Sequence, residues 1–86
     1  MQIKKELLKR SIGGDSFLIP MGKTIYDTNG MFILTEIGGF LWDLLPQAQG
    51  PEDLVQAVLA EYEVDEQTAR EDIDAFLEKL GGMGIL

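Results

Sequence analysis

The apolar positions of the first third of the chain alternate with turn-forming residues in the manner of β-strands. Two β-prone runs, Leu7–Ile12 and residues 17–21, flank the sequence Gly-Gly-Asp-Ser at positions 13–16. This pattern predicts a β-hairpin. Pro20 cannot donate a hydrogen bond to a neighbouring strand, so the second strand is expected to lie at a sheet edge there or to end there. Residues 22–27 are expected to form an irregular connection or a short extra strand.

A third strand is predicted at residues 31–34. Asn29-Gly30 suits a tight turn because both residues tolerate positive φ, and the β-prone sequence Met-Phe-Ile-Leu follows directly. Three strands form a small sheet that needs helices against one face to be stable.

From residue 35 onwards the apolar positions change to helical spacing and predict three helices. The first covers residues 36–45, capped by Thr35 and stopped by Pro46, and the second runs from Pro51 to about residue 61. Asp65 can cap the third, Gly81-Gly82 supplies its end, and residues 83–86 are expected to fold back onto the core. Gly38-Gly39 inside the first helix suggests close packing against another backbone. The predicted fold is a single α+β domain over residues 1–86, a winged helix-turn-helix-like arrangement of a three-stranded antiparallel sheet followed by three α-helices.

Composition narrows the possible chemistry. The 86 residues include no cysteine and no histidine, so the commonest metal ligand, the commonest general base and any thiol are missing, and only carboxylates, hydroxyls and lysines remain as candidates for chemistry. We therefore predict a protein that is not an enzyme and has no cofactor or metal. The absence of a long apolar run and of a charged-then-apolar leader predicts a soluble cytoplasmic protein without a membrane partner.

The net charge of -8 lies in the second part of the chain. Residues 1–50 carry five basic and five acidic side chains, whereas residues 51–86 carry two basic and ten acidic ones. An acidic surface repels phosphate backbones, so nucleic acid is an unfavourable partner and a basic peptide or protein a favoured one, although such acidity also serves solubility alone.

Three other features of the sequence suggest other classes of protein or another kind of site. Gly14-Asp15-Ser16-Phe17 is similar to the phosphopantetheine attachment turn of acyl carrier proteins, but Pro20 prevents the helix that should follow Ser16. A winged-helix DNA-binding protein shares the outline, but its recognition helix would need more Lys/Arg than Arg70 and Lys79. The adjacent carboxylates Glu52-Asp53 and Glu71-Asp72 point in different directions on their helices and fit solvated faces better than a metal site.

The order of motifs resembles the PqqD-like family, whose members are recognition elements for ribosomally synthesised and post-translationally modified peptides. The resemblance extends from Leu7 to Leu86. Its most specific part is Asn-Gly-Met at 29–31 followed by Leu-Thr-Glu-Ile-Gly-Gly-Phe-Leu-Trp at 34–42, and Glu-Tyr-Glu-Val-Asp at 61–65 supports it. Two positions depart from the family pattern, because Thr35 replaces the usual Asn and Gly39 the usual Ala.

The resemblance implies a non-catalytic adaptor. In the family, a precursor's leader peptide adds as an antiparallel strand to the third strand, in the crevice between that strand and the third helix, and is presented to a modifying enzyme. The implied partners are the leader peptide and a radical SAM maturase, cyclase or protease, and a homodimer is also possible in the family. The residues expected to contact the peptide are Met31, Phe32, Ile33 and Leu34 of the strand and Arg70, Asp72, Ile73, Asp74, Phe76 and Leu77 of the third helix.

Overall fold

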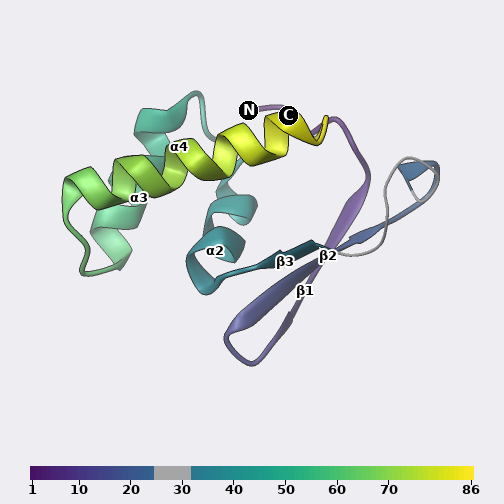
Figure 1. Cartoon of the computed structure of the whole chain (residues 1–86), viewed down its shortest axis with the longest axis horizontal. Coiled ribbons are helices and arrows are strands. Elements are labelled where there is room, and N and C mark those ends of the chain that lie inside the picture. The colour runs from purple at the N-terminus through teal and green to yellow at the C-terminus, as the bar shows by residue number, and fades with distance from the viewer. Residues whose placement is uncertain (25–31) are drawn as a thin grey trace.

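The structure is a computed structural model that describes residues 1–24 and 32–86 (Figure 1). In chain order its elements are β1 (Leu7–Ile12), β2 (Asp15–Pro20), β3 (Phe32–Leu34), α2 (Glu36–Leu44), α3 (Pro51–Glu61) and α4 (Glu66–Gly82). The strands form one antiparallel sheet in the order β1-β2-β3. The predicted fold class, a three-stranded antiparallel sheet followed by three helices, is confirmed.

The hairpin between β1 and β2 is tighter than the sequence suggested. Asp15 and Ser16, expected in the turn, pair with Ile12 and Ser11, so only two residues connect the strands. Gly13 has a φ of +64°, a conformation that glycine adopts without steric cost. Pro20 is the last residue of β2, so the strand ends there, which is one of the two predicted outcomes, and β2 is the central strand of the sheet. The predicted Asn29-Gly30 turn lies outside the described residues.

The helix boundaries follow the predicted caps. Thr35 accepts a hydrogen bond from the Gly38 amide at 3.1 Å, and Asp65 accepts one from the Thr68 amide at 3.1 Å. Helix α2 ends at Leu44, one residue earlier than predicted, and Leu45 is its C-cap. Helix α3 matches its predicted bounds. The end predicted for the third helix is wrong, because Gly81-Gly82 lie inside α4 and Met83 is its C-cap.

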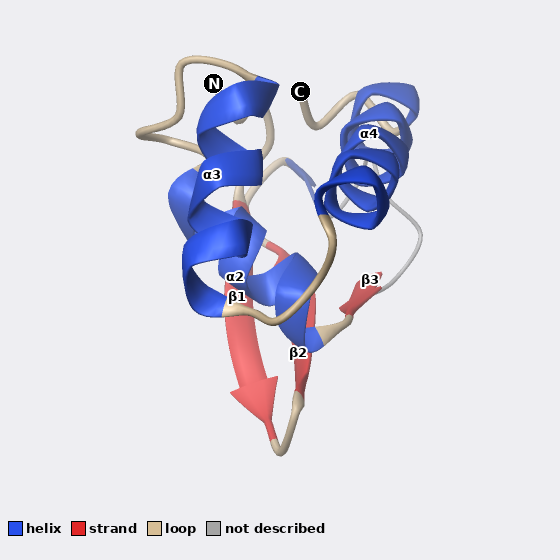
Figure 2. Cartoon of the chain, turned by 90° about the vertical axis from the view of Figure 1, so that its left-hand side faces the viewer, coloured by secondary structure: helices blue, strands red, loops and turns tan. Residues whose placement is uncertain are grey.

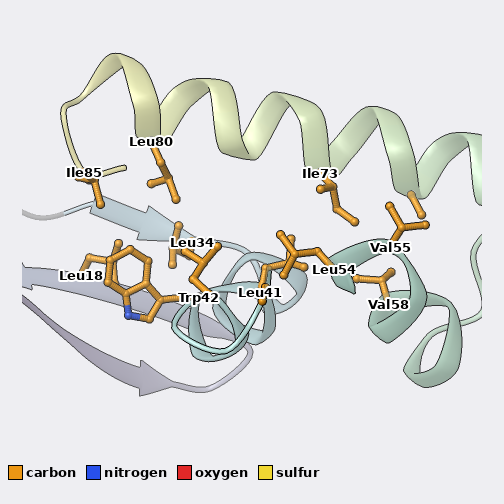
Figure 3. Packing of buried hydrophobic residues seen from close by; sticks show 13 residues of the cluster. Leu18, Leu34, Leu41, Trp42, Leu54, Val55, Val58, Ile73, Leu80 and Ile85 are labelled. Carbon is orange, nitrogen blue, oxygen red and sulfur yellow. The ribbon is translucent and has the colours of Figure 1, made fainter. Parts of the chain in front are cut away.

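After α4 the chain folds back, as predicted. The Ile85 amide donates to the Leu80 carbonyl at 2.9 Å, and the Ile85 carbonyl accepts from the Lys4 amide at 2.7 Å. The Ile85 side chain is completely buried, so this segment joins the two ends of the chain to the core (Figure 3).

One continuous core joins the inner face of the sheet to all three helices (Figure 3). Its members are Leu18 and Leu34 from the sheet, Leu41, Trp42 and Leu45 at α2, Ala48 from the connection between α2 and α3, Leu54, Val55 and Val58 from α3, Ala69, Ile73 and Leu80 from α4, and Ile85. Strand periodicity places Ser16, Leu18 and Leu34 on this inner face. The opposite face of the sheet carries none of these core residues.

Gly39 allows α2 to approach β2 closely. A Cβ atom at this position would lie 2.5 Å from the Ser16 Oγ and 3.1 Å from the Ser16 Cβ. The close packing that Gly38-Gly39 suggested is therefore present, but at Gly39 the neighbour is the Ser16 side chain and not a backbone.

Candidate functional site

An open groove lies between the start of α2 and one face of α4. Its volume is about 630 Å³, and its lining residues are Thr35, Glu36, Ile37, Gly38, Leu41, Asp72, Ala75, Phe76 and Lys79. The four residues from α4 are spaced at i, i+3, i+4 and i+7, which places them on a single face of the helix. The large apolar side chains of the lining are those of Ile37, Leu41 and Phe76. The charged side chains are those of Glu36, Asp72 and Lys79, and all three are exposed.

Strand β3 is an edge strand that leads directly into this groove. It pairs with β2 on one side, and no described strand pairs with its other side. Of the three strands, β3 lies nearest to α4 in both views (Figures 1 and 2). Its last residue, Leu34, precedes Thr35 of the groove lining. No described strand therefore occupies the backbone N–H and C=O groups on that side of β3, and strand addition uses an edge of this kind.

The side chains of β3 point alternately to the two faces of the sheet. Phe32 pairs with the fully buried Leu18 and faces the core, as does Leu34. Ile33 pairs with Phe17 on the other face and is 66% exposed. Of the predicted strand contacts, Phe32, Ile33 and Leu34 are not among the residues that line the groove, and Met31 lies outside the described residues.

The predicted contacts from α4 divide into two groups. Asp72 and Phe76 line the groove. Ile73 is 1% exposed and belongs to the core, against which Leu77 also packs. Asp74 is exposed and lies about 200° around the helix from Asp72, given 100° per residue. Ile73, Asp74 and Leu77 are therefore not among the residues that line the groove.

Arg70, the remaining predicted contact, joins α4 to α3. Its Nη1 and Nη2 donate to the two carboxylate oxygens of Glu52 at 2.7 and 3.0 Å, and its Nε donates to Glu66 at 3.3 Å. Hydrogen bonds from Arg70, and then from Gln56, lower the pKa of Glu52 below its usual value, and the same carboxylate raises the pKa of Arg70. This geometry gives Arg70 a role in holding the helices together.

Sequence reasoning missed several groove residues. It did not select Ala75 and Lys79, although both share the helical face of Asp72 and Phe76. It also treated Ile37 and Leu41 as core alone, because the apolar stripe of α2 does not distinguish residues beside the groove from those beneath it. The i, i+3, i+4, i+7 spacing around Phe76 could have identified the α4 residues.

The site has few groups suited to chemistry. Within residues 1–24 and 32–86, no group of three or more His, Cys, Asp or Glu side chains is placed to hold a metal ion. Ser16, the residue of the carrier-like motif, is 5% exposed near the start of the central strand β2, and its Oγ lies 3.1 Å from the Ser11 Oγ. It does not open a helix, and its hydroxyl is covered by α2. None of the described helices is long and apolar enough to cross a membrane.

Comparison with known proteins identifies the family. Residues 23–86 match the family described as "Coenzyme PQQ synthesis protein D (PqqD)", and the chain belongs to this family. The fold is similar to that of a solved structure described as "TbiB1 in Complex with the TbiA(beta) Leader Peptide". That likeness has a TM-score of 0.75 at 29% sequence identity and covers all of this chain and 94% of the other. No curated protein matches this sequence.

Proposed function

We propose that this protein is a non-catalytic adaptor that binds the leader segment of a ribosomal precursor peptide. The peptide adds to the free edge of β3 as an antiparallel strand, between β3 and α4, and is presented to a modifying enzyme. The observation that carries the proposal is that β3, whose outer edge pairs with no described strand, ends directly before a largely apolar groove. Family membership and the similarity to a protein solved with a leader peptide support it.

The physical basis is strand addition. The β3 backbone supplies hydrogen bonds to any extended peptide, whatever its sequence, and the groove supplies selectivity for the side chains that point into it. Every second side chain of the added strand would face the groove, where Ile37, Leu41 and Phe76 offer an apolar surface. A volume of about 630 Å³ accommodates more than one large apolar side chain.

The charged residues of the groove favour a basic group beside the apolar anchor of the peptide. Glu36 and Asp72 contribute two carboxylates, and Lys79 contributes one ammonium group. Neither Asp72 nor Lys79 forms an ion pair with another described residue. The class of modifying enzyme, whether radical SAM maturase, cyclase or protease, stays a prediction from the family.

Filling the groove tests the proposal. Ala75 is exposed and lines the groove, so Ala75→Trp should block the groove without disturbing the core. We expect the affinity for the leader peptide encoded beside the gene to fall by about tenfold or more, because apolar anchors at such sites are worth more than about 1.4 kcal/mol. Isothermal titration calorimetry measures the affinity of both proteins.

The matched control is Ala60→Trp, the same change at an exposed helical position of α3 that does not line the groove. This variant should bind the peptide as the wild type does. Circular dichroism on both variants verifies that each is folded. A folded Ala75→Trp variant with unchanged peptide affinity would refute the groove as the binding site.

A further inference from the structure

The groove carries opposite charges at two separate places along α4. Asp72 and Lys79 lie on the same face of this helix, seven residues apart, and Ala75 and Phe76 lie between them. Helical rise separates the two charges by about 10.5 Å along the helix axis. The groove wall formed by α4 is therefore acidic at one end, apolar in the middle and basic at the other end.

These charges are not neutralised within the part of the chain that the structure describes. Asp72 and Lys79 form no ion pair with a described residue, and neither does Glu36, the third charged residue of the lining. Glu71 and Glu78 precede Asp72 and Lys79 by one residue each and lie about 100° around the helix from them. Each end has one such neighbour, so the difference in charge between the ends is unchanged.

The direction of β3 relative to α4 decides which end a bound peptide meets first. β3 runs towards the start of α2, and α4 runs in the opposite direction (Figures 1 and 3). In Figure 3, β3 runs from the side of Leu80 towards the side of Ile73, the neighbours of Lys79 and Asp72 in the sequence. A strand that is antiparallel to β3 therefore runs in the same direction as α4. Its amino-terminal part passes Asp72, and its carboxyl-terminal part passes Lys79.

The spacing of the lining residues agrees with the repeat of an extended peptide. Side chains on one face of a strand are about 6.8 Å apart, because each residue advances the chain by about 3.4 Å. Phe76 lies about 6 Å along α4 from Asp72, which corresponds to one such step. Lys79 lies about 4.5 Å beyond Phe76, and its long side chain can reach a residue one further step along the peptide. Three successive inward side chains of the peptide can therefore face Asp72, Phe76 and Lys79 in turn.

The amino end of α2 has a small effect on this pattern. A helix amino end is equivalent to about half a positive charge, whereas Glu36 in the first turn of α2 carries a full negative charge. The α2 wall therefore does not add net positive charge to the groove, and Lys79 is the cation of its lining.

We propose that the groove recognises the order of charges along the leader segment: a basic residue, an apolar residue two positions later and an acidic residue two positions after that. This inference rests on the proposed function and extends it, because strand addition through the backbone accepts either order of charges. Lys79 also suits the carboxyl end of its own helix. That role is indifferent to the order of charges in a peptide, which is therefore the quantity to measure.

Two synthetic peptides of identical composition measure the effect of order. One has the central sequence Lys-Thr-Leu-Thr-Glu and the other Glu-Thr-Leu-Thr-Lys, with the same uncharged flanks. Acetylated amino ends and amidated carboxyl ends remove the terminal charges. The protein is labelled at isoleucine δ1 methyls, so that Ile37 reports binding in the groove while Ile73 and Ile85 are core references. The leader peptide encoded beside the gene is titrated in parallel.

The peptide with the basic residue first should bind about fivefold more tightly at low salt, because two exposed charge contacts are attractive in one order and repulsive in the other. The preference should shrink as the salt concentration rises. Equal affinities, or tighter binding of the peptide with the acidic residue first, would overturn the inference while the Ile37 response leaves the proposed function intact.

An exchange of charges on α4 provides an independent test. The double variant Asp72→Lys, Lys79→Asp keeps the net charge and should reverse the preference between the two peptides. Asp72→Lys alone should remove most of the preference. Asp74→Lys is the matched control, because Asp74 is exposed and lies about 200° around the helix from Asp72, and it should keep the wild-type preference. Circular dichroism verifies that each variant is folded, and a folded double variant with the wild-type preference would refute the inference.

The leader peptide separates failure of the inference from failure of the proposed function. If the leader peptide shifts Ile37 but neither synthetic peptide does, the proposed pattern of charges is wrong and the proposed function stands. If none of the three peptides shifts Ile37, the groove is not the peptide site, and the proposed function and the inference both fail.

Discussion

At the residue scale, packing between α2 and β2 depends on a single missing side chain. Gly39 lies in the middle of a helix, where glycine is unfavourable, and the Ser16 hydroxyl occupies the space that a larger residue would need. Ser16 is itself held by Ser11 on the neighbouring strand. Glycine at this position destabilises the helix slightly, but it allows the start of α2, which forms one wall of the groove, to pack closely against the sheet.

Gly39→Ala should therefore destabilise the protein although alanine is the better helix former. A Cβ atom 2.5 Å from the Ser16 Oγ forces a shift, and overpacking of this kind costs about 1–3 kcal/mol of unfolding free energy. Gly81→Ala is the matched control, because no heavy atom lies within 4 Å of its Cβ position, and it should be neutral or stabilising. Urea denaturation of both variants measures the difference.

A double-mutant cycle with Ser16→Ala tests whether contact with Ser16 causes the destabilisation by Gly39→Ala. Removing the hydroxyl relieves the closest contact, so Gly39→Ala should cost less in the Ser16→Ala background than in the wild type. Equal costs in the two backgrounds would show that Ser16 is not the obstacle.

At the scale of elements, the position of α4 relative to α3 has an electrostatic component. Arg70 of α4 binds both carboxylate oxygens of Glu52 at the start of α3, a bidentate geometry that is stronger and more specific than a single contact. Both side chains are accessible to solvent, so screening limits the strength of this pair. The Arg70–Glu52 pair matters for the site because it orients α4, whose opposite face carries the groove residues.

From the Arg70–Glu52 ion pair we predict that the stability of the protein depends on pH. The pKa of Glu52 is lowered in the folded protein, so its stabilising effect is fully present above its usual value of 4.5 and is lost as the pH falls through the lowered value. Arg70→Met should therefore reduce stability at pH 7, and its difference from the wild type should shrink below pH 4.5. Urea denaturation across pH 3–7 measures this difference.

Lys79→Met, on the same helix, is the comparison variant, because Lys79 forms no ion pair with a described residue. Its stability difference from the wild type should change less over the same pH range. High salt should also reduce the effect of Arg70→Met. A difference between Arg70→Met and the wild type that is constant with pH would contradict the proposed electrostatic origin.

At the scale of the whole molecule, the last residues connect parts of the chain that are distant in sequence. Ile85 is buried beside Leu80, and its carbonyl holds the amide of Lys4 just before β1. The amino terminus is in turn tied to the helical half, where the Met1 amino group donates to the carbonyls of Leu45 and Ala48. The sheet and the helices are therefore joined at the chain ends as well as through α2.

Ile85→Ala should lower the unfolding free energy by about 2–5 kcal/mol, as large-to-small changes at fully buried positions do. Ile33→Ala, the same substitution at a position that is 66% exposed, should cost far less. Thermal or urea denaturation compares the two variants. Equal losses would mean that the carboxyl-terminal segment does not belong to the core.

The sequence by itself determined the elements and their order. Strand alternation, helical spacing and the caps at Thr35 and Asp65 are local properties, and each element was predicted with its type and, within two residues, its bounds. The motif from the strand into α2 also indicated the PqqD family, because it combines local signals in a fixed order. These predictions succeeded because short-range backbone and side-chain chemistry decides them.

Tertiary structure decided which side of each element faces the site. An apolar stripe on α4 predicts burial but cannot say whether Phe76 borders the groove while Ile73 lies beneath it, since that depends on where α2 and β3 pack. In the same way, the pairing of β3 with β2 places Ile33 on the face of the sheet opposite the helices, and Glu52 of α3 forms an ion pair with Arg70. These are contacts between distant parts of the chain, and no local pattern encodes the partner that each residue meets.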